Sequence, residues 1–174
     1  SEMCIRDSIT TEEEGWKAGK EKGGFVIHTK KTETGLNCIR GQGVMDFSAD
    51  KVFEFINTDG NIGKYDSSHK EGRAVETPDL GVGLNFSYSR YKGGTMISDR
   101  DFCFIGASIK EDDGTILICY TSAEHPDCPE VKKCVRGELY IGGWILTPDK
   151  DDPENKCYAH YITQTNPKGS VPKY

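Results

Sequence analysis

The pattern of apolar and polar positions predicts two helices in the front part of the chain. The stretch "TTEEEGWKAGKEKGG" begins with threonines that each have a glutamate three residues later, which is the spacing of a capping box, and it ends on two glycines. We therefore expect a helix over residues 10–24, with Trp16 as the large apolar residue that anchors it. A second helix is predicted over residues 49–57, "ADKVFEFIN", because its apolar residues have helical spacing and Ser48 precedes them as a cap.

Most of the remaining chain is rich in strand-forming residues separated by turn residues. Strands are predicted over residues 25–31 and 36–47, joined by the turn "TETG". The glycine-bearing stretch 58–72 is predicted to be a loop or a broken helix. After it, we expect almost unbroken strand structure over residues 73–78, 83–94, 100–124 (a hairpin that turns at Asp112–Gly114), 134–148 and 157–167.

This order of elements predicts one α+β domain built on a curved antiparallel sheet. Long antiparallel strands with one short helix between them cannot cover both faces of a sheet. A sheet of this kind normally wraps around something. Nothing remains in the sequence that would fill it.

Composition limits the class of protein further. The chain has 174 residues, of which 35% are hydrophobic and 29% charged, as in one soluble globular domain. A net charge of −6 argues against a nucleic-acid partner, which requires a basic face. No apolar run is long enough to cross a bilayer. The scattered cysteines and the lack of an apolar segment at the N-terminus predict a cytoplasmic protein with reduced thiols.

Catalytic and metal-binding patterns are weak. His125, Cys128 and Cys134 supply only three zinc ligands, with no obvious fourth nearby. The pair Gly81 and Gly83 lacks the further residues of a phosphate-binding loop. We therefore expect no cofactor, no metal and no enzyme activity.

Several motifs, taken in order, resemble the START lipid-binding domain, named for the steroidogenic acute regulatory protein. They are Arg100-Asp101-Phe102, His125-Pro126, Arg136, Gly142-Gly143-Trp144, and Asn166-Pro167-Lys168-Gly169 followed by Pro172-Lys173. The front half is similar more loosely, so the resemblance covers roughly residues 10–174. It implies a helix-grip fold, in which a U-shaped sheet wraps around a long C-terminal helix and leaves an apolar tunnel for one lipid.

The two ends of the chain carry expectations of their own. In the family, "PKGxxPK" leads into the gripped helix, so the resemblance implies that this chain stops where that helix should begin. The first residues, "SEMCIRDS", look like a non-native scar. We therefore expect a C-terminally truncated domain over residues 9–174, with residues 1–8 foreign to it.

Strand alternation sorts the candidates for the tunnel wall, but which side of each strand faces inward stays open. The nominated lipid-binding residues are Phe86, Tyr88, Phe102, Tyr120, Arg136, Tyr140, Trp144, Tyr161 and Gln164. Many family members carry another arginine shortly after the Arg100 motif, where this chain has "IGAS", residues 105–108. That departure argues against a buried charge for a ligand head group on this strand.

Arg100 and Asp101 are interpreted as a fold-defining ion pair or a clasp on a loop. Arg136 is the better candidate for a polar tunnel contact, with Glu138 as a possible partner, although a buried arginine needs a partner and its pair could be purely structural.

The sequence thus predicts a monomeric cytoplasmic module that binds one phospholipid, sterol or sphingolipid and exchanges it at membranes through transient contact. An alternative is a lipid-sensing regulatory domain of a larger protein. A third hypothesis is an enzyme that uses a related cavity, such as a cyclase, for which His160 with Glu138 is the one pair to test.

Overall fold

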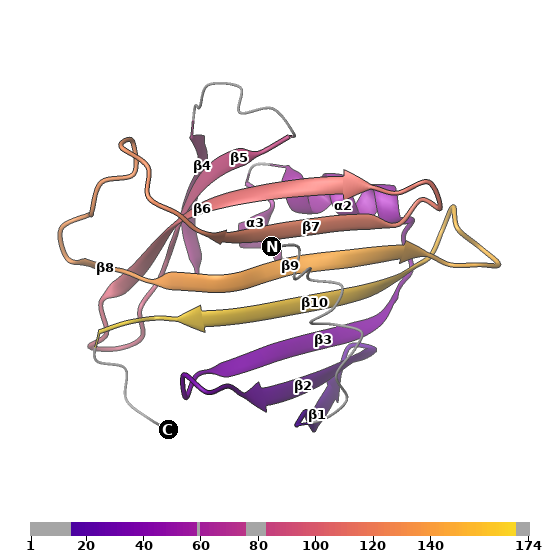
Figure 1. Ribbon diagram of the computed structural model, residues 1–174, viewed down its shortest axis with the longest axis horizontal. Coiled ribbons are helices and arrows are strands. Elements are labelled where there is room, and N and C mark those ends of the chain that lie inside the picture. The colour runs from indigo at the N-terminus through magenta and orange to yellow at the C-terminus, as the bar shows by residue number, and fades with distance from the viewer. Residues whose placement is uncertain (1–14, 59, 76–82, 170–174) are drawn as a thin grey trace.

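The fold was analysed in a computed structural model that describes residues 15–58, 60–75 and 83–169. One large sheet dominates it, and two short helices lie on one side of that sheet (Figure 1). The elements are β1 (Lys17–Lys22), β2 (Phe25–Lys31), β3 (Asn37–Met45), α2 (Ala49–Asn57), α3 (Ile62–Tyr65), β4 (His69–Val75), β5 (Asn85–Tyr91), β6 (Asp99–Lys110), β7 (Ile116–Ser122), β8 (Cys134–Arg136), β9 (Glu138–Pro148) and β10 (Cys157–Asn166).

The sheet places the last described strand beside a strand from the front of the chain. Its order is β1-β2-β3-β10-β9-β7-β6-β5-β4, and neighbours on this path pair antiparallel. The last strand, β10, is therefore inserted between β3 and β9 at the centre. The short strand β8 lies off the path and pairs parallel with the start of β6. Figure 1 shows β4 and β5 turning away from the direction of the central strands, which curves the sheet toward the side that carries α2 and α3.

Helix α2 forms where the sequence predicts it and covers the inner face of the sheet. Ser48 caps it by accepting a hydrogen bond from the Lys51 amide at 3.4 Å. Its residues Ala49 and Val52 are buried against the inner face of the central strands, in a cluster that includes Ile118 and the fully buried Leu146. This helix therefore fixes which face of the sheet becomes the interior.

The predicted turns are confirmed. Gly35 and Gly114 both have positive φ angles, 77° and 84°, which glycine adopts without a steric penalty. The first ends the "TETG" turn between β2 and β3. The second closes the β6–β7 hairpin, where the Glu111 amide donates to the Thr115 carbonyl at 2.8 Å.

The helix predicted over residues 10–24 is wrong in its described part. Residues 17–22 form strand β1, which pairs with β2 around a turn at Gly23 and Gly24. Both glycines have positive φ angles, so the feature interpreted as a helix end is a hairpin turn. All six residues of β1 are exposed, so no apolar face was available to show the strand period in the sequence.

Two further boundaries differ from the prediction. Strand β4 begins at His69, inside the stretch predicted as loop or broken helix, although α3 does provide the broken helix. The strand predicted over residues 134–148 is divided at Gly137. A Cβ atom at Gly137 would lie 2.4 Å from Cε1 of Phe102, so only glycine lets β8 and β9 pass this ring.

The outer face of the sheet has its own apolar cluster. Cys38, Ile145 and Ile162 are buried there, and Trp16 packs against them. The guanidinium of Arg40 lies over the Trp16 ring at 4.6 Å. Trp16 thus anchors its segment as predicted, although it precedes a strand rather than sitting on a helix.

Some expectations fall outside the described residues. These are the capping boxes at Thr10 and Thr11, the scar at residues 1–8, the end of the strand predicted over 73–78, and the segment that would start a C-terminal helix. Within the part of the chain that the structure describes, β10 is the last element.

Candidate functional site

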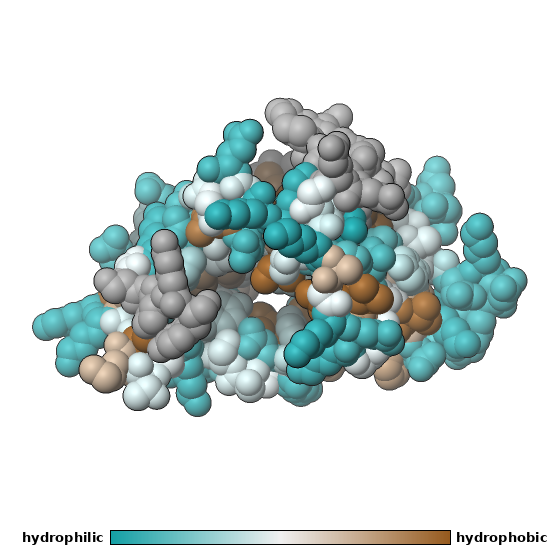
Figure 2. Space-filling model, turned by 90° about the horizontal axis from the view of Figure 1, so that it is seen from below, coloured by the Kyte–Doolittle hydropathy of each residue, from teal (hydrophilic) through white to brown (hydrophobic). Residues whose placement is uncertain are grey.

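A cavity of about 890 Å³ lies on the inner face of the sheet, lined by residues of α2, α3, β4 to β7, β9 and β10. This volume falls within the range of roughly 300–1,000 Å³ that is usual for small-molecule sites. The apolar wall comes from Phe53, Ile56, Phe104, Ile118 and Trp144. Figure 2 shows the molecule hollowed at its centre, with apolar residues at the edge of the opening.

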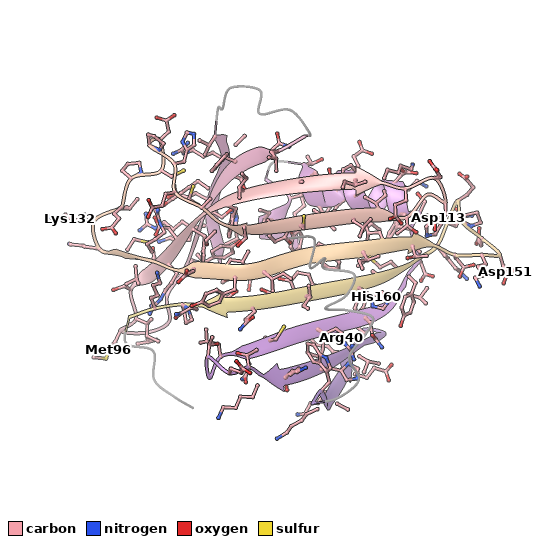
Figure 3. All side chains as sticks on the ribbon, viewed as in Figure 1. Arg40, Met96, Asp113, Lys132, Asp151 and His160 are labelled. Atoms are coloured by element: carbon pink, nitrogen blue, oxygen red, sulfur yellow. The ribbon has the colours of Figure 1, made fainter. Side chains whose placement is uncertain are left out.

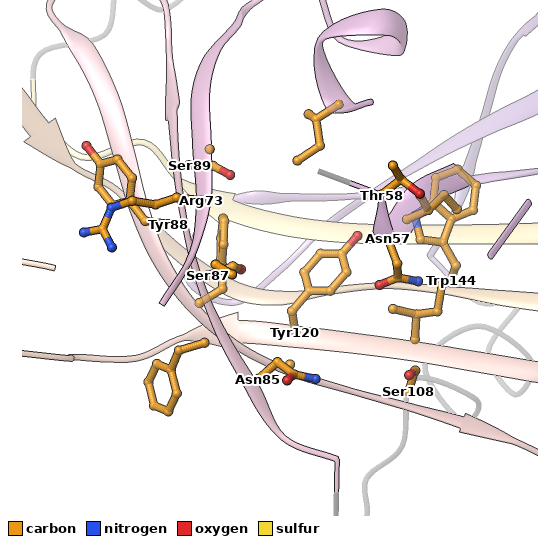
Figure 4. Close-up of a pocket in the computed structure, with 18 of the residues that line it drawn as sticks. Asn57, Thr58, Arg73, Asn85, Ser87, Tyr88, Ser89, Ser108, Tyr120 and Trp144 are labelled. Carbon is orange, nitrogen blue, oxygen red and sulfur yellow. The ribbon is translucent and has the colours of Figure 1, made fainter. Parts of the chain in front are cut away.

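Tyr120 projects from the floor of this cavity. Figure 4 shows it between Ser87 and Ser89 on one side and Asn57, Thr58 and Trp144 on the other. Its ring lies against the backbone of Gly142, where a Cβ atom would come within 2.6 Å of the ring. Burial raises the pKa of Tyr120 well above its ordinary value. The phenol is therefore neutral at physiological pH.

One end of the cavity is polar. The lining there includes Tyr65, Asp66, Tyr91 and Tyr161. Burial, the largest cause, raises the pKa of all three tyrosines, that of Tyr91 to about 12, and the nearby Asp66 carboxylate raises each of them further. These phenols act as neutral hydrogen-bonding groups around one carboxylate.

The structure brings five of the nominated residues to the cavity and leaves four away from it. Those in the lining are Phe86, Tyr88, Tyr120, Trp144 and Tyr161. The rings of Trp144 and Tyr161 lie 4.6 Å apart and extend the aromatic wall.

Phe86 and Tyr88 border the cavity but pack mainly on the other face of β5. The Phe86 ring lies 4.9 Å from the His125 ring, and Tyr88 is buried with Cys103 and Cys128. Whether any of these residues contacts a lipid stays a prediction.

Phe102, Tyr140 and Gln164 lie outside the cavity lining. Phe102 stacks on Phe104 at 5.6 Å and is buried behind it. Tyr140 is 41% exposed, because a bulge in β9 leaves it without a partner on β10 and reverses the alternation at that point. Gln164 lies on the outer face and donates to the Thr32 hydroxyl at 3.0 Å.

Arg136 also lies outside the lining and is held in an ion pair. It donates to both carboxylate oxygens of Asp101, at 3.1 and 3.0 Å, and to the carbonyls of Cys128 and Pro129. Asp101 is 1% exposed. The contacts of Arg136 thus agree with the second interpretation, in which its ion pair is structural. Glu138, the partner suggested from the sequence, pairs instead with Lys168 at 3.2 Å.

Arg100 provides the clasp that the sequence suggested. Its guanidinium donates to the carbonyls of Ser98, Pro167 and Lys168 at 2.6, 3.1 and 3.0 Å. It thus ties the segment after β10 to the start of β6. Arg100 and Asp101 are neighbours in sequence but have separate partners.

The metal-binding and catalytic candidates from the sequence can be located in the described part of the chain. Among the described residues, no group of three or more histidine, cysteine or acidic side chains could hold a metal ion. His160 lies on the outer face, near Arg40 (Figure 3). Glu138 pairs with Asn166 on β10, six positions from His160, which corresponds to roughly 20 Å along the strand. This pair does not converge on the cavity.

Sequence reasoning missed a group of cavity residues from α2, α3 and β4 to β6. The missed residues include Phe53, Ile56, Tyr65, His69, Tyr91 and Phe104. The apolar face of the predicted 49–57 helix could have indicated the first two. Tyr91 shares the strand period of Ser87 and Ser89, but nothing local marks that side of β5 as the inner one.

Comparison with known proteins identifies the fold. A sequence model of the START domain matches residues 4–174. Mouse StAR-related lipid transfer protein 5 is 28% identical over 162 residues, which cover 91% of this chain and 76% of that protein. The solved structure of human StAR-related lipid transfer protein 5 superposes with a TM-score of 0.81 at 25% identity, covering 94% of this chain and 77% of that one. The predicted helix-grip class, with a curved antiparallel sheet and few helices, is confirmed.

A second relative is much longer than the match. The Arabidopsis thaliana protein ENHANCED DISEASE RESISTANCE 2-like is 26% identical over 136 residues, which cover 75% of this chain but 19% of that protein. The chain thus spans about a fifth of that relative and about three quarters of the mouse protein. No helix in the described residues is both long and apolar enough to cross a membrane.

Proposed function

Because this chain belongs to the START domain family, we propose that it binds a single lipid in the cavity on the inner face of its sheet and carries it between membranes. The observation that carries the proposal is the cavity itself, about 890 Å³ with an aromatic and aliphatic wall. The similarity to proteins named for lipid transfer supports it.

The physical role of such a cavity follows from the cost of wetting a lipid. Exposure of an acyl chain to water costs about 0.8 kcal/mol per methylene, so a chain of about sixteen carbons costs on the order of 12 kcal/mol. A carrier lowers this cost by enclosing the chain. The mechanism is desolvation and release at a membrane, without covalent chemistry. The proposed carrier acts as a cytoplasmic monomer that contacts membranes transiently.

The test is native mass spectrometry of the protein, expressed from its complete open reading frame and incubated with mixed-lipid vesicles. We expect one lipid per chain. Ser87→Trp, which places a large ring inside the cavity, should abolish the adduct. Ile109→Trp is the control, since Ile109 is 63% exposed and outside the lining. Absence of an adduct on the unmodified protein would reject lipid carriage.

A second candidate is a lipid-sensing domain within a larger protein. The observation that favours it is the small share, 19%, of the Arabidopsis relative that this chain covers. The complete open reading frame decides between the two. A neighbouring domain whose activity changes with lipid only when residues 9–174 are intact would support sensing, whereas transfer between donor and acceptor vesicles by this domain alone would support carriage.

A further inference from the structure

The charged side chains around the cavity are arranged in a way that restricts the lipid. Within the described lining, carboxylate, imidazole and guanidinium groups come only from Asp66, His69 and Arg73. Arg73 pairs with Tyr88 across β4 and β5, on the face opposite Ser87 and Tyr120. Its guanidinium lies 5.4 Å from the centre of the Tyr88 ring and donates to the Asp127 carbonyl. Arg73 therefore binds the loop that covers the outer face.

The part of the floor nearest Tyr120 has no charge either. Gly106, Ala107 and Ser108 line the cavity on β6. A Cβ atom at Gly106 would lie 3.0 Å from the Cys119 carbonyl oxygen and 3.3 Å from the Tyr120 Cβ, so the neighbouring strand leaves little space for a side chain there. The one polar side chain among these three residues is the Ser108 hydroxyl.

The polar end of the cavity carries one negative charge. Asp66 accepts from the amide and the hydroxyl of Ser68, at 2.9 and 2.6 Å, which fixes its orientation. Around it are the phenols of Tyr65, Tyr91 and Tyr161, which stay neutral. The imidazole of His69 packs on the edge of Tyr91, at 5.4 Å between ring centres.

These groups can form hydrogen bonds with a lipid hydroxyl, but the Asp66 carboxylate would repel an ionised phosphate. A lipid hydroxyl both donates and accepts, so it can donate to the Asp66 carboxylate and accept from a phenol. An ionised phosphate would lose its hydration and face a carboxylate. The described lining contains no lysine, and its one arginine, Arg73, has its guanidinium on the Tyr88 ring and the Asp127 carbonyl, so neither offsets that loss.

We propose that the cavity selects lipids with an uncharged, hydroxyl-bearing polar group, of the sterol or diacylglycerol kind, and discriminates against lipids with an ionised phosphate or sulfate. The proposal rests on the lipid-binding function proposed above. It assigns the polar group of the lipid to the end of the cavity formed by α3 and the start of β4, where Tyr65, Asp66 and Tyr91 lie.

The experiment uses lipid pairs that share an apolar body and differ in charge. The protein from the complete reading frame is incubated with vesicles that contain equal amounts of cholesterol and cholesterol sulfate, or of dioleoylglycerol and dioleoyl phosphatidic acid, and bound lipid is measured by mass spectrometry. The pH is 8, above the ordinary titration range of histidine. We expect at least tenfold more of the neutral member in at least one pair.

Two variants test the assignment of the polar end. Asp66→Asn keeps an acceptor for Ser68 but removes the charge, and it should raise retention of the charged lipid about tenfold. Ser87→Arg adds a cation beside Tyr120 and should shift the preference the same way. Asp151→Asn is the control, because Asp151 lies in the distant β9–β10 loop (Figure 3).

The outcomes separate the two proposals. Equal or greater retention of the charged lipid by the unmodified protein overturns the selectivity but leaves lipid carriage intact. Retention of no lipid from any vesicle rejects carriage itself. If the Asp66 and Ser87 variants fold and keep the neutral preference unchanged, the polar end is wrongly assigned.

Discussion

Strands β5 and β6 carry the cavity on one face and the loop of residues 125–133 on the other, and the two faces differ in how polar groups are partnered. On the loop side, the fully buried Asp101 is matched by Arg136, and Arg73 reaches the loop backbone. On the cavity side, the same strands present Ser87, Ser89 and aromatic rings. The cations of this region hold the fold together, and the cavity face of β5 and β6 is left with neutral groups.

The two faces of these strands serve different purposes, one for stability and one for the cavity. A buried ion pair tolerates little change, since loss of one partner leaves the other as an uncompensated buried charge. A hydroxyl-lined cavity tolerates occupation and emptying, because neutral groups cost less to dehydrate than ions. The division between the two faces lets a ligand enter one face without disturbing the ion pair on the other.

The largest effect is expected from removal of the buried carboxylate of Asp101. Asp101→Ala leaves Arg136 without its bidentate partner, and we expect a loss of about 3 kcal/mol in the free energy of unfolding. Chemical denaturation measures it. Asp50→Ala is the matched control, since the Asp50–Lys110 pair is exposed and should contribute about 0.2–1 kcal/mol. Equal losses in the two variants would contradict a special role for the buried pair.

A smaller effect is expected on the cavity side. In Gly142→Ala the new methyl group would lie 2.6 Å from Cε2 of Tyr120, so the ring must move into the cavity. We expect a loss of about 1–3 kcal/mol in stability, as for other overpacked sites, together with weaker lipid retention. Thermal unfolding and the native mass spectrum report the two effects.

The control for this variant is Gly94→Ala, where the nearest atom to the new Cβ is the Ile97 Cδ1 at an ordinary 3.4 Å. Unchanged lipid retention in Gly142→Ala, at normal stability, would show that the position of Tyr120 does not limit the cavity.

The smallest effect concerns a more exposed charge cluster at the start of β6. Hydrogen bonds to Asp99 from Lys70, the Gly93 amide and Arg90 lower the pKa of its carboxyl to about 2, below the ordinary 3.8. A depressed folded-state pKa stabilises the fold above the unfolded pKa and loses that contribution as protonation proceeds. Stability should therefore fall as the pH drops from about 4 to 2.

Melting temperatures measured across that window, for the unmodified protein and Asp99→Asn, isolate this contribution. The variant should be less stable at pH 6 and show a shallower fall toward pH 2. Parallel curves for the two proteins would assign the acid sensitivity to other carboxylates.

Helices and strands were predicted well wherever apolar residues recur with the helical or strand spacing along the sequence. Helix 49–57 has its cap and its buried face in the sequence, and its bounds agree with the structure. The segment 17–22 failed because every residue in it is exposed, so its lysines and glutamate fit a helix or a strand equally. There, pairing with β2 decided the conformation, and pairing is a long-range contact.

The cavity was predictable only in part, for a related reason. Alternation divides Phe86 and Tyr88 from Ser87 and Ser89 but does not say which set faces inward. The predicted pair, Phe86 and Tyr88, packs chiefly beneath the 125–133 loop, while the serines face Tyr120. The bulge at Tyr140 reversed the alternation again within one strand.

The sequence by itself determined the family, the helix over residues 49–57 and the glycine turns at Gly35 and Gly114. These features are local, or recur at fixed spacing along the chain. Only the tertiary structure decided which face of β5 and β6 is the interior, that Arg136 belongs to Asp101, and that Arg100 holds the segment after β10. Those choices depend on what covers each face of the sheet, and the covering segments are distant in sequence from the strands that they bury.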